Sequence, residues 1–331
     1  MAPTLYPLRL DPYLSRPIWG GDKLRQRYGK GAGTPGSIGE SWEIFEGDTI
    51  QNGALAGKTL RDLTEQLGEL LLGTAAIGNP AGRFPLLIKL IDATQQLSIQ
   101  VHPNDQQAQV LEGEPFGKTE AWYILDADPG AKLVYGLAHP LTPEALRQRS
   151  ADGSIEQDLA YLPVQAGDVV LVPAGTIHAI GAGIVLYEVQ QTSSTTYRLY
   201  DWNRRGPDGK SRELHLDKAA QVASLTPPAQ EKVTPRDPGR QAGAPQQELV
   251  RCPYFVLERI ALQASWTCHP AGRSFIGLTC TSGSVTLSSS AQDWADESLC
   301  PGGSLLLPAA LDACVIQPVG GAAELLLARL P

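Results

Sequence analysis

Several features that mark particular protein classes are scarce or missing in this chain of 331 residues. Basic residues are fewer than acidic ones, and the net charge is -8. This charge argues against a nucleic-acid-binding protein. No apolar run approaches the length that spans a bilayer, and the N-terminus lacks the pattern of a signal peptide. The five cysteines form no C-x-x-C pair, as expected for reduced thiols. We therefore expect a cytoplasmic globular protein without a nucleic-acid or membrane partner.

Glycine and proline are abundant, with 34 and 26 residues, which indicates many turns between short strands. Helical spacing is rare by comparison. The pattern predicts an all-β fold with helical insertions. The expected strands cover residues 86–91, 97–101, 121–125, 168–172 and 184–189, and the expected helices cover 58–72, 103–112 and 143–150.

A faint internal repeat suggests two related β-units. Residues 167–178 read GDVVLVPAGTIH, and residues 302–313 read GGSLLLPAALDA. A gapless alignment of these segments places Ala313 at the position of His178, so only the first copy would carry chemistry. One short match can also arise by coincidence between two apolar strands. Residues 226–248 contain almost no large apolar side chain and are expected to form a linker. We predict a catalytic domain over 1–225 and a second, degenerate, metal-free domain over 249–331.

Polar residues placed on apolar strands suggest a metal site. Gln100 and His102 alternate with Val101 and so share one face of a strand. Glu120 begins the apolar segment AWYIL, on the same face as Lys118, and His178 ends the first repeat copy. Imidazole and carboxylate groups suit a divalent ion such as zinc. Each group also has an ordinary interpretation, as an exposed strand end, a surface ion pair or a turn histidine.

Two cationic residues lie in unusual places. Lys89 interrupts the apolar strand LLIKLI, and Arg198 lies in the polar, threonine-rich segment 188–202. A buried lysine needs a negative partner, and arginine binds phosphate well. Lys89 could instead extend its ammonium group to solvent at a sheet edge. His139, His215 and His269 are interpreted as surface or structural residues.

The same segments, in the same order, resemble type I phosphomannose isomerases. The resemblance covers about residues 5–225 and rests on PLLIKLIDATQQLSIQVHPND, GKTEAWYIL, GDVVLVPAGTIHAI, EVQQTSSTTYRLYDWNR and GKSRELHLDKA, with IWGG at 18–21 and GESWE at 39–43. It implies two cupin-type (jelly-roll) β-barrels with one Zn²⁺ per chain in the first barrel.

Matched by motif, the resemblance implies a role for each candidate residue. The metal ligands would be Gln100, His102, Glu120 and His178, and the substrate-binding residues would be Lys89, Ser98 and Lys118. Arg198 falls on the catalytic arginine and Glu188 on a carboxylate suited to proton transfer.

The implied reaction interconverts mannose 6-phosphate and fructose 6-phosphate through an enediol, in a monomer or small homo-oligomer. A cupin oxygenase and a non-catalytic sugar-binding cupin are the alternatives. An oxygenase would be recognised by its oxygen consumption. A sugar-binding cupin would be recognised because it forms no product in a coupled assay.

Overall fold

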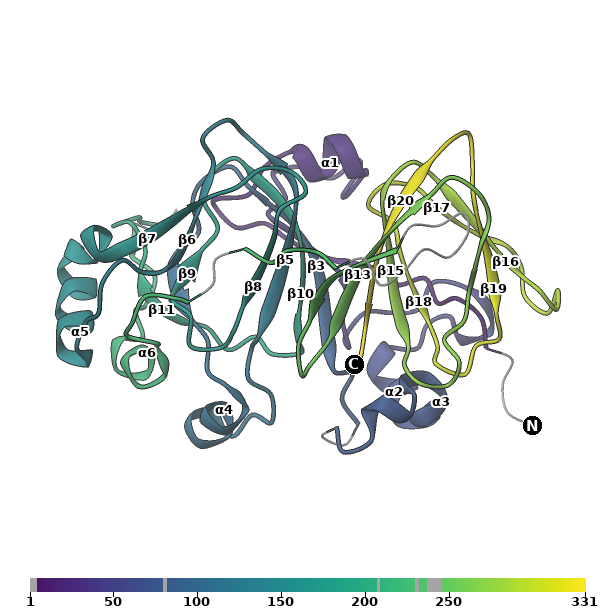
Figure 1. Ribbon diagram of the computed structural model, residues 1–331, viewed down its shortest axis with the longest axis horizontal. Coiled ribbons are helices and arrows are strands. Elements are labelled where there is room, and N and C mark those ends of the chain that lie inside the picture. Colours follow the sequence, from purple (N-terminus) through teal and green to yellow (C-terminus); the bar gives the residue numbers. More distant parts are fainter. Residues whose placement is uncertain (1–4, 80–81, 207–208, 230–231, 237–245) are drawn as a thin grey trace.

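The computed structural model describes residues 5–331 apart from 80–81, 207–208, 230–231 and 237–245. Two β-barrels lie side by side, with the helices at their edges and ends (Figure 1). Each barrel consists of two antiparallel sheets. The expected all-β class, with two barrels and small helical insertions, is confirmed. Among the described residues, no helix has both the length and the apolar character needed to cross a membrane.

The first barrel contains a six-stranded and a five-stranded sheet. The larger has the order β1-β2-β3-β10-β5-β8, with bounds Tyr13–Ser15, Glu40–Ile44, Leu86–Ala93, Ile184–Gln191, Glu120–Ala127 and Val169–Val172. The smaller has the order β11-β4-β9-β6-β7, with bounds Tyr197–Tyr200, Ile99–Val101, His178–Ala179, Lys132–Leu137 and Leu159–Pro163. All five strands expected from the sequence are present, with ends shifted by a few residues.

The second barrel contains a five-stranded and a four-stranded sheet. One has the order β12-β13-β20-β15-β18, with bounds Gln246–Arg251, Val256–Leu262, Ala323–Arg329, Ile276–Ser282 and Ser304–Leu307. The other has the order β14-β19-β16-β17, with bounds Trp266–Cys268, Cys314–Pro318, Val285–Ser289 and Glu297–Leu299. The two barrels have equivalent strand orders. The order β3-β10-β5-β8 of the first corresponds to β13-β20-β15-β18 of the second, and β4-β9-β6-β7 corresponds to β14-β19-β16-β17. The repeat suggested by the sequence is therefore an architectural one.

The detailed alignment of the repeat needs a correction. His178 begins β9 and pairs with Gln100, whereas Cys314 begins β19 and pairs with Cys268. Cys314, and not Ala313, therefore occupies the place of His178. The physical reason is loop length, because residues 173–177 connect β8 to β9 whereas the longer segment 308–313 connects β18 to β19.

Strand β3 forms the contact layer between the barrels. All eight of its residues are buried, because alternate side chains face two different cores. Ile88 and Leu90 join a large core that includes Phe255 and Leu257 of the second barrel, whereas Ile91 belongs to a core of the first barrel. Lys89 shares the face of Ile91 and therefore points into the first barrel.

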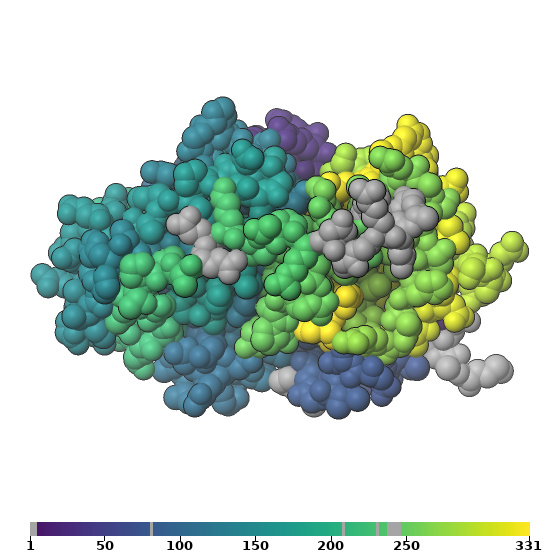
Figure 2. Space-filling view, in the orientation of Figure 1, coloured from purple at the N-terminus to yellow at the C-terminus, as the bar shows by residue number. Residues whose placement is uncertain are grey.

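The N-terminal region also contacts both barrels. Leu8 forms an antiparallel bridge with Leu306 of β18, and Ala309 donates a backbone hydrogen bond to Leu71. In Figure 2 the segment near residue 70 lies against the second barrel. The division into 1–225, 226–248 and 249–331 stays a prediction, and residues 230–231 and 237–245 of the expected linker lie outside the described residues.

The three helices expected from the sequence are present, and one of them is divided in two. The helix expected over 58–72 is divided into α2, Leu60–Leu67, and α3, Glu69–Leu72, because Gly68 between them adopts a φ of 50°. The other two expected helices are α4, Asp105–Glu112, and α5, Pro143–Asp152. Asn104 caps α4 and Thr142 caps α5 through hydrogen bonds that their side chains accept. Two further helices, α1, Lys23–Tyr28, and α6, Leu216–Val222, were not predicted. Short 3₁₀ turns occur at Gly53–Leu55, Thr74–Ala76 and Ser154–Asp158.

Asp48, buried between β2 and α2, makes the stability of the fold depend on pH. Burial raises the pKa of Asp48 to about 8, although its carboxyl group accepts a hydrogen bond from the Phe45 N–H. The unfolded chain releases this proton near pH 4, so the folded state loses stability as the pH rises from about 4 to about 8. We expect Asp48→Asn to be more stable than wild type by about 2 kcal/mol near pH 9, and the difference to shrink toward pH 5. Urea unfolding at several pH values measures it, and a difference independent of pH would contradict this assignment.

Candidate active site and metal centre

Three buried side chains from separate strands meet inside the first barrel. His102 follows β4, Glu120 begins β5 and His178 begins β9, and each is only 1% exposed. Nε2 of His178 lies 3.1 Å from one Glu120 oxygen, and Nε2 of His102 lies 3.6 Å from the other. The potential ligand atoms of the three residues all lie within 4.8 Å of one another. Two imidazoles and a carboxylate at this spacing form a metal-binding site.

Both imidazoles are held in the tautomer that a metal ligand requires. Nδ1 of His102 donates to the backbone carbonyl of Thr195 at 2.9 Å, and Nδ1 of His178 donates to that of Thr176 at 2.8 Å. A carbonyl only accepts hydrogen bonds, so the Nε2 atoms keep their lone pairs. Burial and the charge of Lys118 hold the pKa of His102 well below its usual range, which keeps the ring neutral.

Glu120 is an ionised carboxylate that lacks adequate partners. Burial would raise its pKa, but Lys118 and the two neighbouring imidazoles together outweigh burial and hold the pKa well below its usual range. Nζ of Lys118 lies 2.8 Å from Glu120 and 3.1 Å from Nε2 of His102. Among the described residues, however, no donor makes a well-aligned hydrogen bond with either oxygen of Glu120. A divalent cation would satisfy this carboxylate and both imidazoles, so the residues present fit a metal.

Gln100 lies beside this cluster. It is in β4, two residues before His102, as predicted. Its amide nitrogen lies 3.3 Å from Nε2 of His178, and its backbone pairs with that residue across the sheet. Rotation of the amide by half a turn would present the oxygen instead, and oxygen is the atom that ligates a metal. The structure therefore brings Gln100 to the cluster, and its role as a fourth ligand stays a prediction.

A cavity of 320 Å³ lies next to the metal cluster and contains the other predicted site residues. Its walls come from both sheets of the first barrel and from the segments after β1 and after β11. All five predicted catalytic and substrate-binding residues line it, namely Lys89, Ser98, Lys118, Glu188 and Arg198, and Gln100 lines it as well. Residues scattered over more than 100 positions of the chain thus converge on one space.

Lys89 and Glu188 form a buried ion pair within this cavity. They are paired across β3 and β10, and Nζ of Lys89 lies 3.1 Å from Glu188. Burial lowers the pKa of Lys89, but the nearby carboxylates, of which Glu188 contributes most, together outweigh burial and raise the pKa above its usual range. Nε1–H of Trp122 donates to the second oxygen of Glu188 at 2.8 Å. The carboxylate is thus fixed in position, and Lys89 is not a surface lysine.

Arg198 is a half-buried cation that contacts a hydroxyl and a backbone carbonyl. Its side chain donates to the Ser98 hydroxyl at 3.3 Å and to the Glu213 carbonyl at 2.8 Å. Among the described residues, no carboxylate forms an ion pair with it. Burial and the neighbouring charge of Arg212 lower its pKa, although an arginine remains charged at neutral pH. His215, predicted to be structural, accepts a hydrogen bond from the backbone N–H of Arg198.

Sequence reasoning missed three contributors to the cavity. Trp122 orients Glu188, Glu40 lies 3.7 Å from Lys89, and Arg212 lines the wall near Arg198. Trp122 could have been found, because it lies two residues after Glu120 and so shares its face of the strand. Glu40 and Arg212 lie in the motifs GESWE and GKSRELH, but their spacing alone indicates no partner.

Known proteins are similar to this chain in sequence and in fold. Residues 8–133 match the family described as phosphomannose isomerase type I, catalytic domain. The mannose-6-phosphate isomerase of Streptococcus mutans is 38% identical over 264 residues, which cover 78% of this chain and 80% of that protein. The mannose-6-phosphate isomerase ManA of Bacillus subtilis is 38% identical over 275 residues, 79% of this chain and 81% of that one.

A solved structure agrees over nearly the whole chain. The crystal structure of the mannose 6-phosphate isomerase from Bacillus subtilis superposes with a TM-score of 0.86 at 32% identity, and covers 97% of this chain and 99% of that one. The shared fold places both barrels in the same arrangement. Together with the two-histidine, one-carboxylate cluster, these similarities show that the chain belongs to the type I phosphomannose isomerase family.

Proposed function

We propose that this protein interconverts mannose 6-phosphate and fructose 6-phosphate, as an aldose-ketose isomerase. The observation that carries the proposal is the convergence of three groups on one cavity of 320 Å³. They are a metal-binding cluster, a fixed carboxylate and the Arg198 guanidinium, which has no ion-pair partner among the described residues. A relative that bears the name of this activity is 38% identical to this chain, and a crystal structure that bears the same name shares its fold.

The positive groups of the cavity suit the phosphate of the substrate. Lys89, Ser98 and Lys118 are the proposed substrate-binding residues, with Lys89 and Ser98 nearest the phosphate. The Ser98 hydroxyl lies beside the Arg198 guanidinium, so a phosphate oxygen bound to one would also lie near the other. A phosphate anchored away from the reacting carbons holds C1 and C2 in place for the chemical step.

Glu188 is the proposed base. It takes a proton from C2 of the open-chain aldose and returns it to C1, while a proton moves between the two oxygens through the enediol. Lys89 and Trp122 hold the carboxylate, so it does not reorient during the transfer. Arg198 provides positive charge for the oxygen that becomes negative in the transition state.

The metal ligands proposed are Gln100, His102, Glu120 and His178, and the ion proposed is one Zn²⁺ per chain. Nitrogen and oxygen donors in this combination suit zinc. When bound, the ion acts as a Lewis acid that stabilises negative charge on oxygen. The free state of all described cysteines agrees with the proposed cytoplasmic location.

A coupled assay for fructose 6-phosphate on chelated and zinc-restored protein tests this function. We expect chelation to remove activity and zinc to restore it. A sugar-binding protein would give no product under either condition. A cupin oxygenase would consume oxygen when supplied with iron, and either result would reject the isomerase assignment.

Lys89→Met tests the proposed phosphate contact. A hydrogen bond to a charged group contributes about 1.5–3 kcal/mol, so we expect KM for mannose 6-phosphate and the inhibition constant of inorganic phosphate to rise roughly 10- to 100-fold. Lys132→Met, on the exposed part of β6, is the matched control and should change neither constant. A loss confined to kcat would show that Lys89 serves Glu188 and not the phosphate.

A further inference from the structure

The second barrel has a cavity of its own, larger than the candidate active site. Its volume is 560 Å³, compared with 320 Å³ for the cavity of the first barrel. Strands β12, β13, β14, β15 and β20 and the loop over 269–274 line it. The proposed isomerase chemistry uses none of these residues.

Strand register shows that the two cavities occupy equivalent places. In the first barrel Lys89, Glu188 and Trp122 are aligned across β3, β10 and β5. In the second barrel the aligned set across β13, β20 and β15 is Glu258, Leu327 and Leu278. Glu258 and Leu327 line the second cavity, as Lys89 and Glu188 line the first. The second cavity is therefore the counterpart of the candidate active site.

The chemistry of this counterpart has changed. The pair Gln100 and His178 is replaced by Cys268 and Cys314, and the place of Glu120 is taken by Ile276. The proton-transfer carboxylate Glu188 is replaced by an apolar side chain. A cavity that has lost the residues for isomerisation and keeps its volume can still bind a ligand.

The lining of the second cavity favours an anion. It contains three arginines, Arg251, Arg273 and Arg329, and one acidic residue, Glu258, although the whole chain carries a net charge of -8. Glu258 neutralises Arg329 through two contacts at 3.0 and 3.3 Å, and Arg251 pairs with Glu248, which does not line the cavity. Among the described residues, no acceptor contacts the Arg273 guanidinium. Arg273 is therefore available to a ligand.

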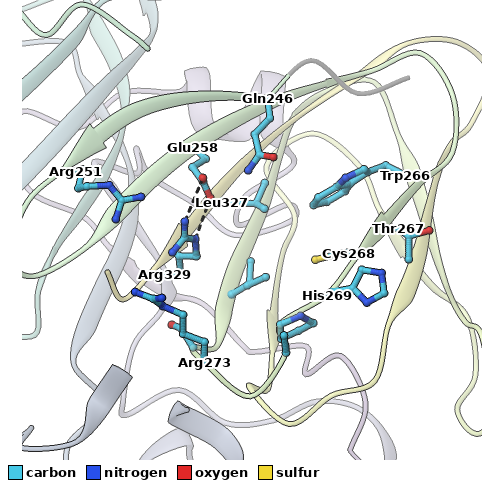
Figure 3. Close-up of a pocket in the computed structure, with 14 residues that line it drawn as sticks. Gln246, Arg251, Glu258, Trp266, Thr267, Cys268, His269, Arg273, Leu327 and Arg329 are labelled. Carbon is cyan, nitrogen blue, oxygen red and sulfur yellow. Dashed lines mark hydrogen bonds and ion pairs between the residues drawn. The ribbon is translucent and has the colours of Figure 1, made fainter. Parts of the chain in front are cut away.

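An aromatic side chain faces the arginines. Figure 3 shows Arg251, Arg273 and Arg329 on one side of the cavity, with Trp266, Cys268 and His269 on the other. Trp266 is half-buried and extends into the cavity, so part of its ring is open to a flat or apolar ligand surface. Sugar and nucleobase rings both stack on such a surface.

We propose that the second cavity binds a phosphorylated small molecule that carries a ring, with the phosphate on Arg251 and Arg273 and the ring on Trp266. A sugar phosphate and a nucleotide share this chemistry, and both are small enough for a cavity of 560 Å³. The site lies in the second barrel and is separate from the metal cluster of the first. The second barrel would thus be a binding module within the isomerase chain.

Calorimetry and tryptophan fluorescence on the full-length, zinc-loaded protein test the proposal. The probes are inorganic phosphate, fructose 6-phosphate and ADP. Subtraction of the Trp266→Phe signal from that of wild type isolates the response of Trp266. We expect fructose 6-phosphate or ADP to bind more tightly than phosphate and to change that response. If fructose 6-phosphate is the ligand, calorimetry should show two sites for it per wild-type chain, one of them in the active site, and if ADP is the ligand only the active site should bind fructose 6-phosphate.

Matched variants assign the binding to the cavity. Arg273→Ala and Arg251→Ala should each weaken the Trp266-linked site about tenfold or more, with an unchanged isomerase kcat that also shows correct folding. Arg147→Ala, on α5 at the far end of the first barrel, removes the same charge and should have no effect. The proposal is overturned if no probe changes the Trp266 response, if the ring-bearing probes bind no tighter than phosphate, or if binding survives both arginine variants.

Discussion

His102→Ala and His178→Ala are each expected to lose bound metal and isomerase activity together. Both Nε2 atoms point at Glu120, and each ring is fixed by the hydrogen bond that its Nδ1 donates to a backbone carbonyl. Loss of a residue that only orients a ligand already weakens metal binding about 10- to 100-fold, so loss of the ligand itself should weaken it by about 100-fold or more. A Lewis acid contributes several kcal/mol to the barrier, which predicts a fall in kcat/KM of about 1,000-fold.

Metal content per chain after dialysis and kcat/KM are the two measurements for these variants. His139→Ala is the matched control, because this exposed imidazole contacts Asp158 and lies outside the cluster. It should retain both metal and activity. One metal ion per chain in the double variant of His102 and His178 would contradict the ligand assignment, whatever happened to turnover.

The local parts of the metal site could be predicted from sequence, whereas their convergence could not. Alternation along a strand placed Gln100 with His102, and Lys118 with Glu120, on shared faces. Nothing in the spacing shows that β4, β5 and β9 meet, because such contacts depend on sheet order. The resemblance to a known family supplied that link for the first barrel. The partners of the imidazoles are backbone carbonyls, which carry no sequence signal.

The second barrel shows the same limit more clearly. His269 was predicted to be a surface residue, and it is exposed, but it lines a cavity that no local pattern indicates. The residues that form this cavity extend from 246 to 329 and come together only through the register of five strands. Short elements were missed for a related reason. Helices α1 and α6, with six and seven residues, are too short to show a clear period.

Arg198→Ala is expected to keep its metal and lose turnover. The guanidinium contacts Ser98 and the Glu213 carbonyl and none of the metal ligands, so its removal should leave metal content unchanged. A half-buried cation without an ion-pair partner among the described residues stabilises a developing negative charge more strongly than a fully solvated one does. Loss of one such group typically lowers kcat by about 100- to 1,000-fold.

The division of the effect between kcat and KM decides what Arg198 does. A catalytic arginine acts in the transition state, so the loss should lie in kcat, and Arg198→Lys should recover only part of it, because lysine keeps the charge but not the planar fork. The contact with Ser98 allows another outcome, in which Arg198 binds the phosphate of the substrate. A rise in KM with kcat preserved would establish that role and reject the catalytic one. Loss of metal from Arg198→Ala would reject both, because it would make the arginine a support of the metal centre.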